Sequence, residues 1–148
     1  TPAVHPAGGC ELCLQPGGVL VHQAPAWRVI RAEDALFPAF YRVVAREHVA
    51  EWSDLDDAGR ASMMAVVTAV ERVLRAELSP TKVNLASLGN VVPHLHWHVI
   101  ARFEWDAKFP QPVWGETLRQ VSPPAVDRMA RPLEALDAAV RAAVAPLG

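Results

Sequence analysis

The chain has 148 residues, of which 51% are hydrophobic and 20% are charged, a balance typical of one soluble globular domain. The formal net charge of −2 offers no basic face for a nucleic-acid polymer, although a small charged ligand remains compatible with it. No apolar run approaches the roughly 20 residues of a membrane span, and residues 1–9 lack a signal-peptide pattern. We therefore expect a cytoplasmic protein without a membrane partner.

The chain is expected to begin with a flexible segment over residues 1–9, followed by one domain over residues 10–148. Two short runs rich in β-branched and aromatic residues, Trp27–Ile30 and Tyr41–Val44, predict strands. The acidic, proline-containing stretch between them predicts a loop.

A long helix is predicted next. Ser53-Asp-Leu-Asp56 resembles a capping box, in which the Ser53 hydroxyl accepts from the first free N–H groups. Apolar residues between Met63 and Leu74 recur at helical spacing and give one apolar face. Ser79-Pro80 is expected to end the helix, because proline disfavours the α conformation in the residue before it.

The second half of the chain predicts two more strands and a helix. Lys82–Leu88 alternates as a strand does, Gly89-Asn90 predicts a turn, and His94–Phe103 predicts the next strand. Strands joined by so short a connection pair antiparallel. A last helix is predicted to start at Pro132. Helices together with antiparallel strands predict an α+β fold.

Three histidines, His94, His96 and His98, alternate with apolar residues in the strand predicted at His94–Phe103. Alternate side chains of a strand share one face, so the three imidazoles are expected to line up roughly 6.6 Å apart. A phosphate group can contact more than one imidazole across that gap, and three histidines can also hold zinc. The spacing of the histidines alone supports phosphate chemistry and metal binding about equally.

Cys10 and Cys13 form a C-x-x-C pair near the start of the chain. A structural disulfide is not expected in a reducing cytoplasm. The spacing suits half a metal site or a redox pair, and two free thiols are the plain alternative.

The segment His94-Leu-His96-Trp-His98-Val-Ile resembles the His-φ-His-φ-His-φ-φ signature of the histidine triad (HIT) family, where φ is apolar. The similarity extends over roughly residues 10–105 and is closest to the diadenosine polyphosphate hydrolase-like bacterial type. It implies a five-stranded antiparallel sheet, with a long helix and a C-terminal helix packed on it, usually in a homodimer. It also implies a hydrolase that cleaves dinucleoside polyphosphates or nucleoside phosphoramidates at the α-phosphorus.

The resemblance assigns a role to each histidine. His96 is the nucleophile and forms a nucleotidyl-histidine intermediate, with its other ring nitrogen held by a backbone carbonyl near His98. His98 donates to the phosphate or to the leaving group. His94 orients the site or binds metal. No cofactor is required for this catalysis.

Several further residues are candidates for nucleotide binding. Asn84 is expected to reach the histidine face from the neighbouring strand, and Asn90 stands where the family often has a phosphate-contacting amide. Asp34 is a candidate for the ribose hydroxyls, with a solvated loop carboxylate as the alternative. Phe40 occupies a position where many members carry a further histidine, which leaves the preferred leaving group open. Trp114 can shape the pocket or simply pack.

In some relatives the cysteine pair is completed by the histidines that match His48 and His94, so the resemblance implies a structural Cys10, Cys13, His48, His94 zinc site. Two other functions stay open. One is a nucleotidyltransferase, against which the presence of His98 argues, because such members tend to replace it. The other is a zinc-stabilised nucleotide-binding or interaction protein.

Overall fold

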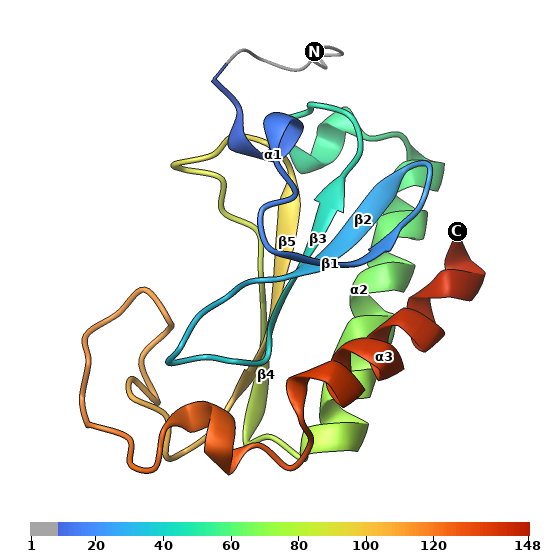
Figure 1. Ribbon diagram of the computed structural model, residues 1–148. Helices are drawn as coiled ribbons and strands as arrows, with labels where there is room; N and C mark the ends of the chain where they lie inside the picture. The colour runs from blue at the N-terminus through green and yellow to red at the C-terminus, as the bar shows by residue number, and fades with distance from the viewer. Residues whose placement is uncertain (1–8) are drawn as a thin grey trace.

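Five antiparallel strands form one sheet in the order β1-β2-β3-β5-β4 in the computed structural model, which describes residues 9–148 (Figure 1). The predicted flexible segment, residues 1–9, lies outside the described residues except for Gly9. The strands are β1 (Val19–Gln23), β2 (Trp27–Arg31), β3 (Phe40–Ala45), β4 (Lys82–Ala86) and β5 (His96–Arg102). The sheet confirms the predicted α+β, HIT-like fold class. Strand β1 is the one strand whose residues were not predicted from the sequence.

The predicted long helix is α2 (Asp57–Leu78), but its N-cap differs from the prediction. Asp56 caps it, with the carboxylate accepting from the Gly59 N–H at 2.8 Å. Ser53 lies instead in a short 3₁₀ helix, Trp52–Asp54, one turn earlier. The predicted end is correct: Ser79 takes a left-handed conformation with φ 46° just before Pro80.

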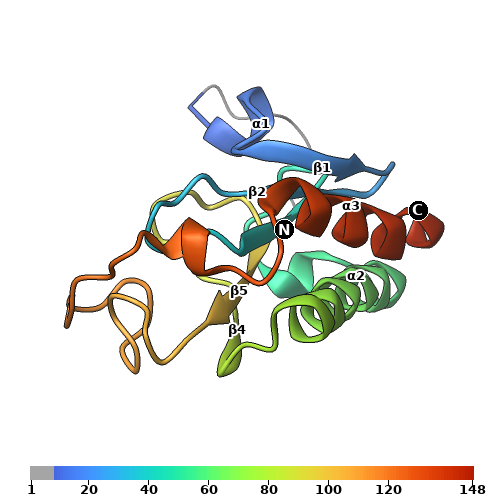
Figure 2. The same cartoon turned by 60° about the horizontal axis from the view of Figure 1, so that its bottom comes forward.

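The two long helices, α2 and α3 (Leu133–Val144), lie together on one side of the sheet (Figure 2). They contact each other as well as the strands, and the main core fills the space between them and the sheet. Val43 and Val99 from the sheet, Val70 from α2 and Leu136 from α3 are fully buried there. The opposite face of the sheet is therefore left for the site.

The C-terminal helix is fastened to the sheet by a buried polar cluster that the sequence did not reveal. Asp137 of α3 accepts from the Tyr41 hydroxyl at 2.6 Å and from Arg31 Nε at 2.9 Å. Burial, followed by the Asp137 carboxylate, raises the pKa of Tyr41, so the phenol stays protonated. Helix α3 begins at Leu133, one residue later than predicted, with Pro132 as its N-cap.

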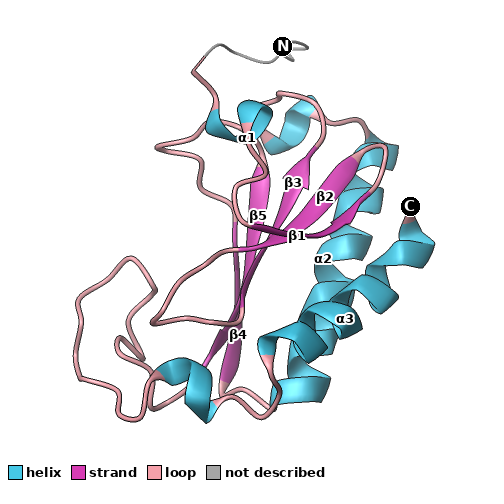
Figure 3. Cartoon of the chain, in the orientation of Figure 1, coloured by secondary structure: helices cyan, strands magenta, loops and turns pink. Residues whose placement is uncertain are grey.

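Residues 103–124 contain no helix or strand and form a large loop beyond the end of β5 (Figure 3). At the other end of the sheet, the short helix α1 (Glu11–Leu14) packs over Ile30 and Val44. Within residues 9–148, none of the helices is long and apolar enough to cross a membrane.

Candidate functional site

His96 and His98 lie on the face of β5 that points away from the helices. In the register with β3, Val44 is opposite His96 and Arg42 is opposite His98. Residues directly opposite in an antiparallel pair share a face, so Arg42 joins the two histidines. Both imidazoles are buried. The predicted alternation therefore holds for His96 and His98.

One nitrogen of the His96 ring is fixed by the backbone. Its Nδ1 contacts the carbonyl oxygen of His94, and because a carbonyl only accepts, Nδ1 carries the proton. The Nε2 lone pair is left as the nucleophilic position. The sequence predicted a backbone carbonyl near His98 as the acceptor, but the acceptor is the carbonyl of His94, two residues before His96. Burial, opposed by this hydrogen bond, lowers the pKa of His96, so the ring is neutral at pH 7.

His98 lies against three aromatic rings in edge-to-face contacts. The ring centroids are 4.9 Å from His96, 5.4 Å from Phe40 and 5.3 Å from Trp114. Burial, with smaller contributions from His96 and the Arg42 cation, lowers the pKa of His98 to about 4. Its Nδ1 is buried and has no hydrogen-bond partner among the described residues. Phe40 thus forms an apolar wall beside His98.

A cavity of about 710 Å³ opens over these histidines. Arg42, His96, His98, Asn90 and Trp114 line it together with Glu11 and Leu12 of α1, Gln15, Gly17 and residues of the 88–92 loop. The guanidinium of Arg42 lies 5.3 Å from the centre of the Phe40 ring and supplies a positive charge for an anionic ligand. Sequence reasoning missed Arg42; its place two residues after Phe40 becomes informative only once the β3–β5 register is known.

His94 does not line the cavity. It precedes β5, which starts at His96 rather than at the predicted His94, and its side chain is buried beside Cys10 and Cys13. Its Nε2 donates to the Ala45 carbonyl at 2.7 Å, which leaves Nδ1 unprotonated. The cysteines that His94 contacts pack against Val44, which is opposite His96, so the His94 imidazole lies on the side of the sheet that carries His96 but outside the cavity.

The Nδ1 atom of His94 belongs to a four-residue cluster. It lies 3.4 Å from the Sγ atoms of both Cys10 and Cys13, and 3.3 Å from His48 Nδ1. Cys13 Sγ lies 3.1 Å from His48 Nδ1. Tetrahedral zinc with ordinary bond lengths separates sulfur from nitrogen by roughly 3.6 Å and nitrogen from nitrogen by roughly 3.3 Å. All four ligand atoms lie within 4.8 Å of one another, so the donors fit one tetrahedral ion.

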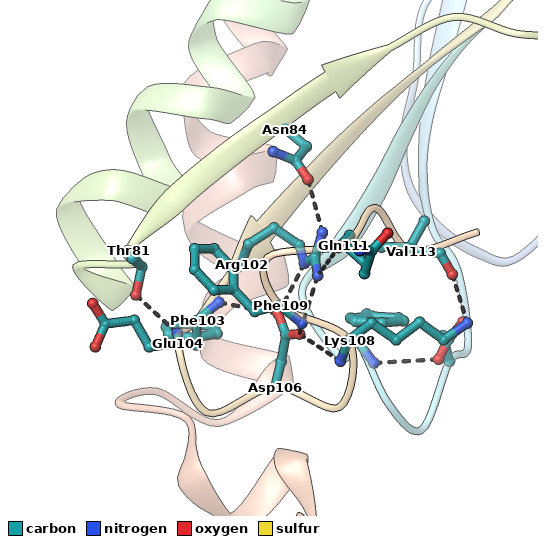
Figure 4. Close-up of polar contacts among 12 residues, drawn as sticks. Thr81, Asn84, Arg102, Phe103, Glu104, Asp106, Lys108, Phe109, Gln111 and Val113 are labelled. Carbon is teal, nitrogen blue, oxygen red and sulfur yellow. Dashed lines mark hydrogen bonds and ion pairs between the residues drawn. The ribbon is translucent and has the colours of Figure 1, made fainter. Parts of the chain in front are cut away.

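The predicted nucleotide-binding residues are only partly brought together. Asn90 lines the cavity. Asn84 lies on the predicted face but accepts a hydrogen bond from Arg102 at 2.9 Å, away from the cavity (Figure 4). Asp34 is exposed and accepts from the Leu36 and Phe37 N–H groups of its own loop, at 2.9 and 3.2 Å. Neither Asn84 nor Asp34 therefore lines the cavity in this arrangement.

The fold and site define a small α+β protein with a histidine pair beneath an anion-compatible cavity, and comparison with known proteins gives its family. The HIT domain family model matches residues 16–105. The chain therefore belongs to the histidine triad (HIT) family. A search of curated proteins gave no significant match.

Three solved structures illustrate the similarity. A histidine triad protein from Bradyrhizobium japonicum is 30% identical with a TM-score of 0.72, over 97% of this chain and 99% of that one. One from Marinobacter aquaeolei is 25% identical with a TM-score of 0.66, over 93% and 92%. A zinc-bound family member from Mycobacterium smegmatis is 19% identical with a TM-score of 0.60, over 94% and 95%, and supports the fold alone.

Proposed function

We propose that the protein is a hydrolase that cleaves dinucleoside polyphosphates or nucleoside phosphoramidates at the α-phosphorus through a nucleotidyl-His96 intermediate. One observation carries this proposal: His96 is held by a backbone carbonyl as its Nδ1–H tautomer, at the wall of a cavity that also contains Arg42. A nucleophile must be unprotonated and held in place, and both conditions are met.

The residues support a two-step reaction. His96 Nε2 forms a bond to the α-phosphorus while the bond to the leaving group breaks, and Arg42 neutralises charge on the non-bridging oxygens. A bound phosphate brings negative charge beside His98 and raises its pKa, so His98 supplies the proton that the leaving group takes. Water then attacks the phosphorus while the bond from phosphorus to His96 Nε2 breaks, and His98, neutral after the first step, takes the proton that water loses. The nucleoside monophosphate leaves, and His96 is again neutral.

We propose that the Cys10, Cys13, His48, His94 cluster holds a structural zinc ion. The ligand distances fit one tetrahedral ion, and the Mycobacterium smegmatis relative is a zinc-bound member of the same family. Zinc there would tie α1 to the ends of β3 and β5. Four protein ligands leave no coordination position for substrate, so the metal's contribution is stability.

The assembly and location are proposals from family resemblance. We propose a nucleotide as the small-molecule partner, a homodimer as the assembly and the cytoplasm as the location. Light scattering coupled to size-exclusion chromatography tests the dimer directly.

The decisive experiment follows AMP release from an adenosine phosphoramidate and from a diadenosine polyphosphate. Wild type is compared with His96→Ala and with His22→Ala. This control removes a histidine that lies outside the cavity and whose Nε2 has no hydrogen-bond partner within residues 9–148. We expect at least a ~10³-fold loss of kcat for His96→Ala, the scale for removal of a nucleophile, and little change for the control.

An alkaline quench of the wild-type reaction adds an independent readout, because a nucleotidyl-histidine adduct should appear by mass spectrometry. Its absence from His96→Ala would place the covalent bond at His96. Full turnover by His96→Ala refutes the mechanism. Nucleotide binding without turnover of either compound would favour a transferase or a binding protein instead.

A further inference from the structure

The short helix α1 contributes residues both to the cysteine cluster (Cys10, Cys13, His48 and His94) and to the cavity. Cys10 is the N-cap of α1 and Cys13 lies within it, and the Sγ atoms of both are 3.4 Å from His94 Nδ1. Glu11 and Leu12, which stand between the two cysteines in the chain, line the cavity. A change in the cluster therefore reaches the cavity wall through α1.

Helix α1 has little stability of its own, because it contains only four residues. The Leu14 N–H donates to the Cys10 carbonyl at 3.2 Å, and the Gln15 N–H donates to the Glu11 carbonyl at 2.8 Å. Isolated helices shorter than roughly 12–15 residues are marginal in water. The position of α1 therefore depends on its contacts with the rest of the protein.

These contacts hold the two ends of α1 separately. At the C-terminal end, Arg28 of β2 donates to three backbone carbonyls, those of Leu12, Gln15 and Pro16, at 2.8, 3.1 and 3.1 Å. At the N-terminal end, the contacts are those of the cysteine cluster with its two histidines. Loss of the cluster therefore leaves α1 attached mainly at its C-terminal end.

The two cysteines are close enough to form a disulfide, but only if α1 changes shape. All ligand atoms of the cluster lie within 4.8 Å of one another, which sets the greatest separation of the two sulfurs. A disulfide needs Cβ atoms about 3.8 Å apart, whereas residues three apart on a helix have Cβ atoms roughly 5–6 Å apart. Cys13 is half-buried and Cys10 is buried, so a small oxidant reaches Cys13 first.

We propose that Cys10 and Cys13 are a reversible oxidation site: a hydroperoxide converts them to a disulfide, which dismantles the cysteine cluster and loosens the α1 wall of the cavity. The Cys13 thiolate attacks one peroxide oxygen, the O–O bond breaks, and hydroxide leaves a sulfenic acid behind. The Cys10 thiolate attacks that sulfur, the S–O bond breaks, a second hydroxide leaves, and the S–S bond forms. The two sulfurs lose two electrons in total, and the peroxide gains them.

The disulfide affects both the metal site and the cavity. A disulfide offers no thiolate, so two of the four ligands proposed for zinc are lost. Glu11 and Leu12 move with α1, so a nucleotide in the cavity loses part of the wall that it contacts. This last step rests on the proposed function, in which the cavity binds a nucleotide, whereas the disulfide and the loosening of α1 do not.

The test compares the reduced, zinc-loaded wild type with the same protein after treatment with hydrogen peroxide and removal of the peroxide by catalase. Mass spectrometry should detect a Cys10–Cys13 disulfide, and a zinc indicator should detect one zinc ion released per disulfide. The amides of Leu14 and Gln15, which make the hydrogen bonds of α1, should exchange with deuterium at least ~10-fold faster after oxidation. The Kd for AMP should rise ~5–20-fold, the usual scale of coupling between two sites.

Dithiothreitol followed by zinc should reverse all of these changes. This reversal separates the cysteine pair from methionine oxidation, because methionine sulfoxide needs its own reductase. Cys13→Ser is the control variant, since it cannot form the disulfide, and peroxide should leave its α1 exchange and its Kd for AMP unchanged. If that variant does not fold, the oxidation and reduction cycle of the wild type decides the question alone.

Three results would overturn the inference. The first is a sulfinic acid on one cysteine in place of the disulfide, and the second is a disulfide with unchanged exchange at Leu14 and Gln15. The third is an unchanged Kd for AMP in oxidised protein whose α1 exchanges faster, which would break the link to the cavity. Reduced protein that does not bind AMP would overturn the proposed function instead, while the disulfide and the exchange rates would still decide whether oxidation loosens α1.

Discussion

Breaking the Arg102–Asp106 ion pair, which anchors the loop at residues 103–121, should destabilise the protein unequally, according to which partner is removed. Arg102 Nε lies 2.8 Å from Asp106 Oδ2, and both side chains are only 2% exposed. In Asp106→Ala, Arg102 keeps only two neutral acceptors, Asn84 Oδ1 at 2.9 Å and the Gln111 carbonyl at 2.7 Å. Three backbone N–H groups lose their acceptor as well. In Arg102→Met, the Asp106 carboxylate keeps those three donors, and the methionine fills part of the guanidinium's volume.

The expected magnitudes follow from burial. Leaving one partner of a buried pair uncompensated costs about 3–5 kcal/mol, and Asp106→Ala should reach the upper part of that range because of the extra unsatisfied N–H groups. Arg102→Met should cost about 1–2 kcal/mol less than Asp106→Ala. The exposed pair of Glu71 and Arg75, 3.9 Å apart, is the control, and Glu71→Gln should change stability by less than about 0.5 kcal/mol.

Urea unfolding followed by far-UV circular dichroism gives the three free energies at pH 7. The double variant Arg102→Met/Asp106→Ala completes the cycle and should cost less than the sum of the single changes, because neither charge is left alone. Equal losses from Arg102→Met and Asp106→Ala, each below 1 kcal/mol, would refute the claim that this pair organises the loop.

Two further outcomes concern pH and metal. Burial lowers the pKa of His98 from 6.5 to about 4, so between these pH values the unfolded chain binds more protons than the folded chain. The contribution of His98 to the free energy of unfolding is therefore complete above pH 6.5. It is lost as the pH falls toward 4, by at most ~3 kcal/mol. Urea unfolding at pH 7 and 4.5 should show a smaller acid loss in His98→Asn than in wild type; parallel losses would contradict this. Chelation should lower the melting temperature of the zinc-loaded protein but not that of Cys10→Ala. Identical shifts in both proteins would refute the proposal that the cluster binds the metal.

Local patterns in the sequence were sufficient for most elements of the fold. Trp27–Ile30 and Tyr41–Val44 were recognised as strands because β-branched and aromatic residues are concentrated there, and both lie within observed strands. Strand β1 was missed although Val19, Leu20 and Val21 are apolar, because a run of three apolar residues without alternation is too short to distinguish a strand from other structure. Ser53 was mistaken for the cap because two capping sequences overlap, and the later one, Asp56, begins the helix.

The loop at residues 103–121 could not be predicted because its order depends on non-local bonds. Arg102 and Asp106 look like solvated charges in the sequence, and Lys108 and Arg119 look like ordinary surface residues. Only the folded chain shows that their hydrogen bonds converge on one another and on backbone carbonyls. The same limit applies to Arg42, whose relation to His98 depends on strand register.

The division of the histidine triad between two sites leads to a last prediction. The backbone carbonyl of His94 accepts the hydrogen bond from His96, and no side-chain substitution removes it. The His94 imidazole belongs to the cysteine cluster. His94→Ala and Cys13→Ala should therefore lower turnover by similar factors, since each removes one ligand of the same cluster and neither side chain lines the cavity. Turnover and metal content of both variants are measured side by side, with His22→Ala as the histidine control. If His94→Ala loses at least ~10-fold more activity than Cys13→Ala at equal metal content, the His94 imidazole acts on the substrate directly, and the division of the triad into a phosphate pair and a metal ligand is wrong.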